Sequence, residues 1–263
     1  MGRIETAFQQ LKAAGHTGLI AYVTVGFPTL AETAGLVQAA LAGGATIIEL
    51  GVPFSDPLAD GATHQRAMGV ALEQGVSMKD CLEVAAALRK DGVSAPLLLM
   101  GYYNTWLSYG LERWCADAAT AGIDGAIVVD LPPEEATKLH EFAHAKGLDM
   151  VFLLAPTSTD DRIEEVGKHA GGFVYCVSLT GVTGARAALP DYLPEFLARV
   201  RRHTTLPLAV GFGISQRDHV QSVGRVAEAA VVGSALTTVI EQAQPGERTA
   251  AVRAFVAELT GRA

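Results

Sequence analysis

A single carboxylate interrupts an apolar run near the start of the chain. The segment ATIIELGV is typical of a buried β-strand, and Glu49 lies in its middle. Side chains alternate along a strand, so Glu49 faces the opposite side from Ile48 and Leu50. Burial raises a carboxyl pKa, which lets the group act as acid and base near neutral pH. We predict a catalytic role. A structural ion pair is the alternative, although residues 41–65 contain no Lys or Arg.

A second carboxylate follows in a loop rich in Pro, Ser and Gly. Asp60 stands in ADG, where Asp is an ordinary turn-forming residue, so its type alone indicates no function. Its place on a long loop after a strand makes it a candidate, because such loops often carry functional residues. The loop, residues 54–61, contains Pro57 and follows Pro53. This pattern suits a surface that docks a partner.

Two glycine-containing turns near the C-terminus predict a phosphate site. GFGIS covers residues 211–215 and GSAL covers residues 233–236, and each places a Ser where a helix should begin. Glycine lets backbone N–H groups approach an anion, and a helix N-terminus adds favourable partial charge. Helix capping by Ser215 and Ser234 is the alternative. A further segment of small residues, SLTGVTGAR at 178–186, is either a lid over the phosphate or a mobile loop.

These candidates must be positioned by apolar runs that alternate with helix-like segments. The expected strands are residues 18–26, 46–52, 96–103, 125–131, 149–155, 172–179, 207–213 and 228–235. The clearest helices between them are residues 30–44, 110–122 and 132–147. Gly43, Gly122 and Gly147 mark helix ends. Continuous apolar strands that alternate with helices predict a parallel sheet.

Eight strand–helix units in 263 residues favour a (β/α)8 barrel, residues 1–263 forming one domain with an extra N-terminal helix. Glu49 is then expected inside the barrel, near the carboxyl ends of the strands. An open doubly wound sheet is the competing fold. That fold usually carries a phosphate loop after its first strand, but here GFPT follows, without a GxGxxG pattern.

Composition excludes several classes of function. A net charge of −8 argues against a nucleic-acid ligand, and no apolar run approaches the ~20 residues of a membrane helix. Cys81, Cys115 and Cys176 are widely spaced, which predicts buried thiols in a reducing cytoplasm. His140 and His144 stand four residues apart on a probable helix, where a solvated helix face is more common than a metal site, so we expect no metal site.

Four segments resemble the α-subunit family of tryptophan synthase: ELGVPFSDPLADG, APTSTDDRI, GFVYCVSLTGVTGAR and AVGFGIS. They occur in order, and the similarity extends over essentially the whole chain. The resemblance implies a (β/α)8 barrel that cleaves indole-3-glycerol phosphate to indole and glyceraldehyde 3-phosphate without a cofactor of its own. It also implies an α2β2 assembly with a β subunit that carries pyridoxal phosphate and consumes the indole.

The resemblance also implies roles for individual positions. Glu49 would be the acid/base residue at indole C3 and at the glycerol hydroxyl, and Asp60 would stabilise charge at N1. Thr183 would meet Asp60 when its loop closes. The implied phosphate contacts are the backbones of Gly184, Gly213, Gly233 and Ser234. The implied substrate pocket is formed by Tyr22, Met100, Ile127, Tyr175 and Phe212.

Four positions depart from the family pattern. Ala62, Thr105 and Val129 stand where Pro is common. His64 stands where an apolar pocket residue is usual, and we expect it at the pocket rim without a catalytic role.

Other functions remain open at this stage. A stand-alone indole-3-glycerol phosphate lyase would share every catalytic residue. A sugar-phosphate isomerase would often show His or Lys at strand ends. A catalytically silent barrel that only activates a partner is disfavoured by the presence of both Glu49 and Asp60.

Overall fold

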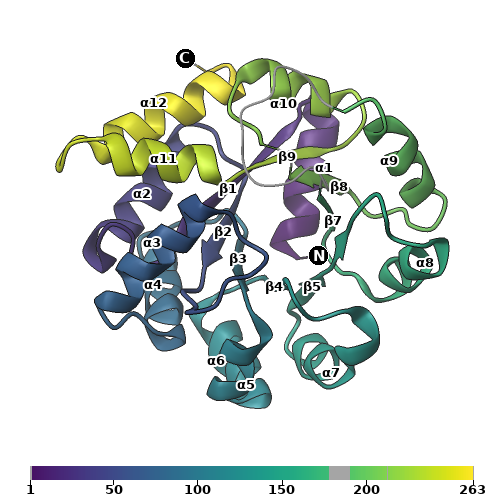
Figure 1. The fold of residues 1–263 in the computed structure, drawn as a ribbon, viewed down its shortest axis with the longest axis horizontal. Helices are drawn as coiled ribbons and strands as arrows, with labels where there is room; N and C mark the ends of the chain where they lie inside the picture. The colour runs from purple at the N-terminus through teal and green to yellow at the C-terminus, as the bar shows by residue number, and fades with distance from the viewer. Residues whose placement is uncertain (1, 178–189, 212, 263) are drawn as a thin grey trace.

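Parallel strands form the centre of the computed structural model, which describes residues 2–177, 190–211 and 213–262 (Figure 1). The strands are β1 (Gly18–Thr24), β2 (Ile47–Gly51), β3 (Leu97–Gly101), β4 (Gly125–Val128), β5 (Asp149–Val151), β6 (Leu153–Leu154), β7 (Val174–Val177), β8 (Leu208–Gly211) and β9 (Ala229–Val232). They form one sheet in the order β5-β4-β3-β2-β1-β9-β8-β7-β6. Each sequence-adjacent βα unit therefore lies beside the next one in space.

The two ends of this sheet belong to the same interrupted strand. Only Phe152 separates β5 from β6; β5 pairs with β4, and β6 pairs with β7. The backbone N–H of Tyr175 donates to the carbonyl oxygen of Phe152 at 3.0 Å. The sheet is thus a nearly closed barrel of eight strands, with β5 and β6 as two parts of the fifth. The predicted (β/α)8 fold is confirmed.

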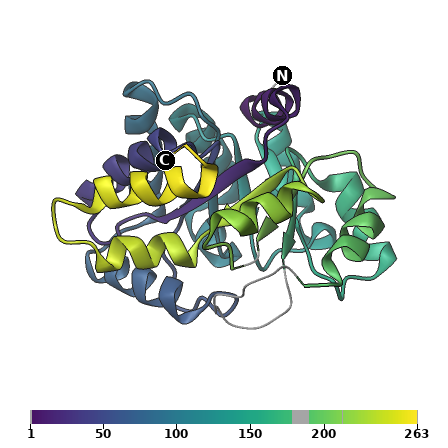
Figure 2. The same ribbon diagram turned by 90° about the horizontal axis from the view of Figure 1, so that it is seen from above.

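Helices surround this barrel (Figure 1). They are α1 (Arg3–Ala14), α2 (Leu30–Ala42), α3 (Ala62–Glu73), α4 (Met78–Lys90), α5 (Tyr103–Tyr109), α6 (Leu111–Ala121), the 3-10 helix η1 (Pro133–Glu135), α7 (Thr137–Ala145), α8 (Asp160–His169), α9 (Leu193–Arg201), α10 (Arg217–Gly224), α11 (Ser234–Gln242) and α12 (Arg248–Thr260). The predicted N-terminal helix is α1, which lies at one end of the barrel (Figure 2). The ring centroids of Phe8 in α1 and Phe173 are 5.7 Å apart, so α1 packs against the inner core at that end.

Apolar side chains fill two layers, one on each side of the strands. Ile47 belongs to the cluster inside the barrel, together with Leu98 and Ile127. Ile48 and Leu50 belong to the larger cluster between the strands and the helices. This alternation confirms that the side of β2 that carries Glu49 faces the barrel interior.

The predicted strands differ from the observed ones mainly at their ends. The first predicted run, residues 18–26, continues past β1, which ends at Thr24. The chain turns there at Gly26, whose φ of 88° is left-handed. The predicted fifth run, residues 149–155, is split at Phe152, which the apolar pattern did not indicate.

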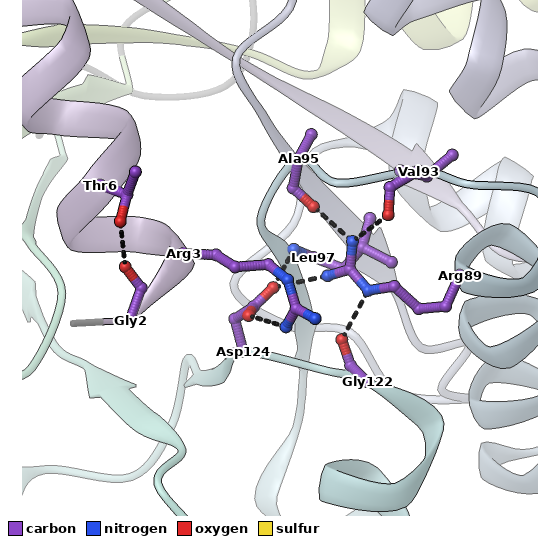
Figure 3. Close-up of polar contacts among 9 residues, drawn as sticks. All are labelled: Gly2, Arg3, Thr6, Arg89, Val93, Ala95, Leu97, Gly122 and Asp124. Atoms are coloured by element: carbon purple, nitrogen blue, oxygen red, sulfur yellow. Dashed lines mark hydrogen bonds and ion pairs between the residues drawn. The ribbon is translucent and has the colours of Figure 1, made fainter.

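A buried carboxylate at the N-terminal end of β4 ties three elements together (Figure 3). Asp124 is only 8% exposed. It accepts hydrogen bonds from Arg89 Nη2 at 2.7 Å, from the backbone N–H of Leu97 at 2.8 Å, and from Arg3 Nη1 at 2.9 Å. Arg89 also donates to three backbone oxygens, those of Val93, Ala95 and Gly122. Asp124 therefore joins α1, α4 and the start of β3.

The first prediction concerns this network. Asp124→Asn replaces an accepting oxygen by an NH2 group, which would face the hydrogen-bond donors that Asp124 now binds. We therefore expect a loss of about 2–4 kcal/mol in the free energy of unfolding. Urea unfolding at neutral pH measures it. Glu241→Gln is the control, because its pair with Arg66 is exposed and its loss should be much smaller. Equal losses for the two variants would contradict a structural role for Asp124.

Candidate active site

Glu49 lies inside the barrel without an oppositely charged partner among the described residues. In the sheet it stands beside Tyr22 of β1 and Leu98 of β3. It is 0% exposed, and neither carboxyl oxygen has a hydrogen-bond partner among the described residues. The ion pair that the sequence left as an alternative is thus not formed with any described residue.

Burial determines the protonation of this group. Removal from water raises the pKa of Glu49 from its ordinary value of 4.5 to about 8. The carboxyl group therefore holds its proton through most of the neutral range and can release it at little cost. Such a group can donate a proton in one step and accept one in the next.

Asp60 is held by a tyrosine from a neighbouring strand end. Tyr102, directly after β3, donates from its hydroxyl to Asp60 Oδ2 at 2.6 Å, and the same hydroxyl accepts from the backbone N–H of Ala59 at 2.9 Å. The ring of Phe54 stacks on that of Tyr102, with the ring centroids 5.1 Å apart. Burial and the Asp60 carboxylate both raise the Tyr102 pKa, so its hydroxyl keeps the proton that it donates. The sequence analysis missed Tyr102, for which the only signal was an aromatic pair at a strand end.

Glycines at strand ends make room for two of the predicted pocket residues. A Cβ at Gly51 of β2 would collide with the Tyr22 hydroxyl, and one at Gly211 of β8 would lie 2.7 Å from the Tyr175 ring. Both tyrosines therefore lie directly over the backbone of the next strand. Tyr175 belongs to the inner core cluster together with Ile127, which is also a buried member of the predicted pocket.

The remaining described pocket residue is Met100. It is the register partner of Ile127 across β3 and β4, and it packs partly buried against the inner cluster. It is also the register partner of Gly51, two residues beyond Glu49. The structure thus brings Tyr22, Met100 and Ile127 to strands on the Glu49 side of the barrel.

The two glycine-containing turns lack the serine caps that the sequence offered as an alternative. α11 begins at Ser234 with Gly233 as its N-cap, and no side chain caps it. α10 begins two residues after Ser215, also without a side-chain cap, and the Ser215 hydroxyl has no partner among the described residues. Gly213 has a φ of 50°, which favours glycine. Uncapped helix N-terminal N–H groups are suited to bind an anion.

His64 links the two halves of this site. Its ring meets the edge of Tyr22 with centroids 4.5 Å apart, and a Cβ at Gly233 would lie 2.9 Å from His64 Nε2. Glu49, Tyr22, His64 and Gly233 therefore lie in succession across β2, β1, α3 and the start of α11. Three predicted residues, Phe212, Thr183 and Gly184, lie outside the described part of the chain, as does the predicted lid at 178–186.

The cysteines take no part in this site, nor does any cluster of possible metal ligands among the described residues. Cys81, Cys115 and Cys176 are buried and unpaired, as predicted. Within residues 2–177, 190–211 and 213–262, no group of three or more His, Cys, Asp or Glu side chains could hold a metal ion. None of the helices described there is long and apolar enough to cross a membrane.

Comparisons with known proteins point to one family. A sequence model of the tryptophan synthase alpha chain matches residues 8–261. The tryptophan synthase alpha chain of Roseiflexus sp. (strain RS-1) is 54% identical over 261 residues, which cover 99% of this chain and 100% of that protein. Tryptophan synthase of Saccharomyces cerevisiae is 44% identical over 255 residues, covering 97% of this chain but only 36% of that longer protein. The solved structure of tryptophan synthase subunit alpha from Legionella pneumophila str. Paris is 34% identical with a TM-score of 0.92, covering 99% of this chain and 98% of that one.

A second prediction follows from the Glu49 pKa. Between pH 4.5 and about 8 the folded chain keeps a proton that the unfolded chain loses, so this group lowers stability as pH rises through that range. The full effect is on the order of 5 kcal/mol. Glu49→Gln removes this contribution to the pH dependence of stability. Urea unfolding should show the variant more stable than wild type at pH 8, with the difference shrinking toward pH 5.

The matched control is Glu228→Gln. Glu228 pairs with Arg201 and accepts from the backbone N–H of Leu208, so its replacement should destabilise the protein at both pH values. A stability difference between Glu49→Gln and wild type that stays constant from pH 5 to pH 8 would show that Glu49 is not the titrating group.

Proposed function

This chain belongs to the tryptophan synthase alpha chain family, and we propose that Glu49 and Asp60 carry out the family's reaction. The chain is a carbon–carbon lyase that cleaves indole-3-glycerol phosphate in partnership with a β subunit. The alpha chain of the family carries no cofactor; pyridoxal phosphate belongs to the β subunit. Within this function, the roles of single residues are our proposal.

The unpartnered carboxyl group of Glu49 is the observation that carries the proposal. Cleavage requires a proton at indole C3 and loss of the N1 proton, which gives the indolenine tautomer. Loss of the glycerol hydroxyl proton then forms the aldehyde and breaks the C–C bond, whose electron pair returns to the ring while N1 regains its proton. Glu49 gives the first proton and accepts the last one, so it ends the cycle in its starting form. Its pKa of about 8 suits both steps near neutral pH.

Asp60 performs the complementary task at the indole nitrogen. The hydrogen bond from Tyr102 orients its carboxylate, and Asp60 is only partly buried. A carboxylate in this environment can accept the N1–H and stabilise the charge that develops there. Two carboxyl groups in such different surroundings can divide acid/base chemistry between them without a metal.

The phosphate and the indole occupy opposite ends of the same site in this proposal. The phosphate binds to backbone N–H groups at Gly213, Gly233 and Ser234, supported by the missing side-chain caps at α10 and α11. The contacts expected of Gly184 at the phosphate and of Thr183 at Asp60 fall on residues outside the described part of the chain. The indole lies among Tyr22, Met100, Ile127, Tyr175 and Phe212.

The setting of the enzyme completes the proposal. In this family the alpha chain and the β subunit form an α2β2 complex, and we propose the same heterotetramer here. Residues 1–263 act as one domain. The three unpaired, buried cysteines support a reducing compartment such as the cytoplasm.

The third prediction tests the two carboxylates. Glu49→Gln keeps the shape of the side chain but cannot exchange a proton, so indole release from indole-3-glycerol phosphate should fall by about 100-fold or more. Indole release by Asp60→Asn should fall by a similar factor. Both variants should still bind glycerol 3-phosphate. Glu73→Gln, an exposed glutamate of α3, is the control and should cleave at the wild-type rate. Near-normal turnover by Glu49→Gln would falsify the proposal.

The β subunit needs a docking surface, for which the sequence indicated the loop at 54–61. In the structure Pro53 and Pro57 are buried, so the prolines do not supply the exposed surface that the pattern suggested. Leu58 supplies an exposed apolar surface instead, because it is 92% exposed. It stands two residues before Asp60, so a partner that covers Leu58 also holds the catalytic loop.

The fourth prediction is therefore a loss of assembly. Leu58→Asp should weaken the binding of a cognate β subunit by about tenfold or more, as removal of a central apolar contact does. Sedimentation or calorimetry with the β subunit measures the affinity. Leu72→Asp is the matched control, because Leu72 is also exposed but lies near the C-terminal end of α3. If the two variants weakened binding of the β subunit equally, Leu58 would not be part of the interface.

A further inference from the structure

His64 is the one titratable side chain at the junction of the proposed pocket and phosphate site that the reaction above leaves without a role. It lies in the first turn of α3, which packs against β1 and α11. Its ring contacts Tyr22 of β1, and its Nε2 faces Gly233, at the turn before α11. No described residue forms a hydrogen bond with Nε2; the one ring bond is made at Nδ1, by Thr237.

Thr237 gives His64 a fixed orientation. It is 2% exposed, and its Oγ1 lies 3.4 Å from His64 Nδ1 and 3.4 Å from the carbonyl oxygen of Gly233. The hydroxyl thus bridges the imidazole and the residue that caps α11. Because Nδ1 is held by Thr237, the other nitrogen must point toward the uncapped N-terminus of α11.

We propose that His64 Nε2 donates a hydrogen bond to the phosphoryl group of the substrate, with Thr237 as the positioning residue. This inference rests on the proposed function, because it takes the turn at Gly233 and Ser234 as the phosphate site. The backbone N–H groups there provide dipoles but no full charge. A histidine that becomes cationic adds a charge-assisted bond, which is about twice as strong as a neutral one.

Proton uptake is a consequence of this contact. Burial lowers the His64 pKa below its ordinary 6.5, while the nearby Asp60 carboxylate opposes this in part. The imidazole is therefore neutral in the ligand-free chain at neutral pH. A phosphate dianion at Nε2 raises that pKa. Binding then takes up a proton, and affinity for the phosphate rises as pH falls through the interval between the two pKa values.

The neighbouring charged groups leave His64 as the group that titrates at this junction. From β1, the Tyr22 hydroxyl keeps its proton because burial raises its pKa strongly. On α11, Glu241 forms an ion pair with Arg66 of α3 on the exposed side of the two helices. Asp60, in the loop before α3, is the remaining carboxylate whose field reaches His64.

Calorimetry with glycerol 3-phosphate from pH 6 to pH 8.5 tests the inference on the full-length chain. At neutral pH, His64→Ile should bind about tenfold more weakly than wild type, because one hydrogen bond to a charged group is lost. His64→Gln, which keeps a neutral donor, should recover part of this loss. Titrations in buffers of different ionisation enthalpy should show that wild type takes up more protons on binding than His64→Ile. The ligand's own titration is common to both and cancels.

A pair of threonines provides an independent measurement. Thr237→Val should weaken glycerol 3-phosphate binding several-fold and reduce the proton uptake. Thr238→Val is the matched control, because its hydroxyl donates to the Ser234 carbonyl at 2.9 Å in the same helix without a bond to His64. Affinity for unphosphorylated indole should be the same in the two threonine variants.

The outcomes separate this inference from the function on which it rests. Gly233→Asp places bulk and negative charge in the phosphate site and should abolish glycerol 3-phosphate binding. If it does while His64→Ile and Thr237→Val bind as wild type at every pH, the His64 contact is wrong and the phosphate site stands. If Gly233→Asp also binds normally, the phosphate site itself is wrong, and the inference fails with it.

Discussion

The burial of one carboxyl group that has no partner among the described residues is the constraint on which the rest of the barrel depends. Glu49 cannot reach water, because strands on both sides fix the backbone of β2. Its neighbours along the strand, Ile48 and Leu50, anchor that backbone in the outer core. The free energy that the unpaired group costs is offset by two apolar clusters that enclose it. The protein is less stable because of the unpaired Glu49, but this carboxyl group holds a proton that is available at neutral pH.

Barrel geometry then assembles the other groups around this carboxyl. Parallel strands all end at one face, so the turns after β2, β3, β8 and β9 converge although they are far apart in sequence. Tyr102 reaches Asp60 across 42 positions, and His64 reaches Thr237 across 173. The glycines at strand ends serve the same purpose, because Gly51 and Gly211 yield the space that the two pocket tyrosines occupy.

These long-range pairs also mark the limit of what the sequence alone could predict. Strand identity, the barrel and the inward direction of Glu49 follow from local periodicity, and the structure agrees with them. The hydrogen bond from Tyr102 to Asp60 depends on the spacing of two loops, which no local pattern encodes. Ser234 begins α11 without capping it, because the N-cap position falls on Gly233. Pro57 is buried although Asp56 and Leu58 on either side of it are exposed, which proline content does not reveal.

Electrostatic coupling connects the two ends of the proposed site. Asp60 acts on His64 through space, since its negative charge favours the imidazolium form. The effect is reciprocal: a His64 that gains a proton when phosphate binds favours the charged Asp60 carboxylate, which can then accept a hydrogen bond from the indole N1–H. Phosphate recognition would in this way prepare the carboxylate for chemistry at the indole end of the same substrate. A ligand without phosphate would leave His64 neutral and Asp60 without that support, which ties cleavage to recognition of the whole molecule.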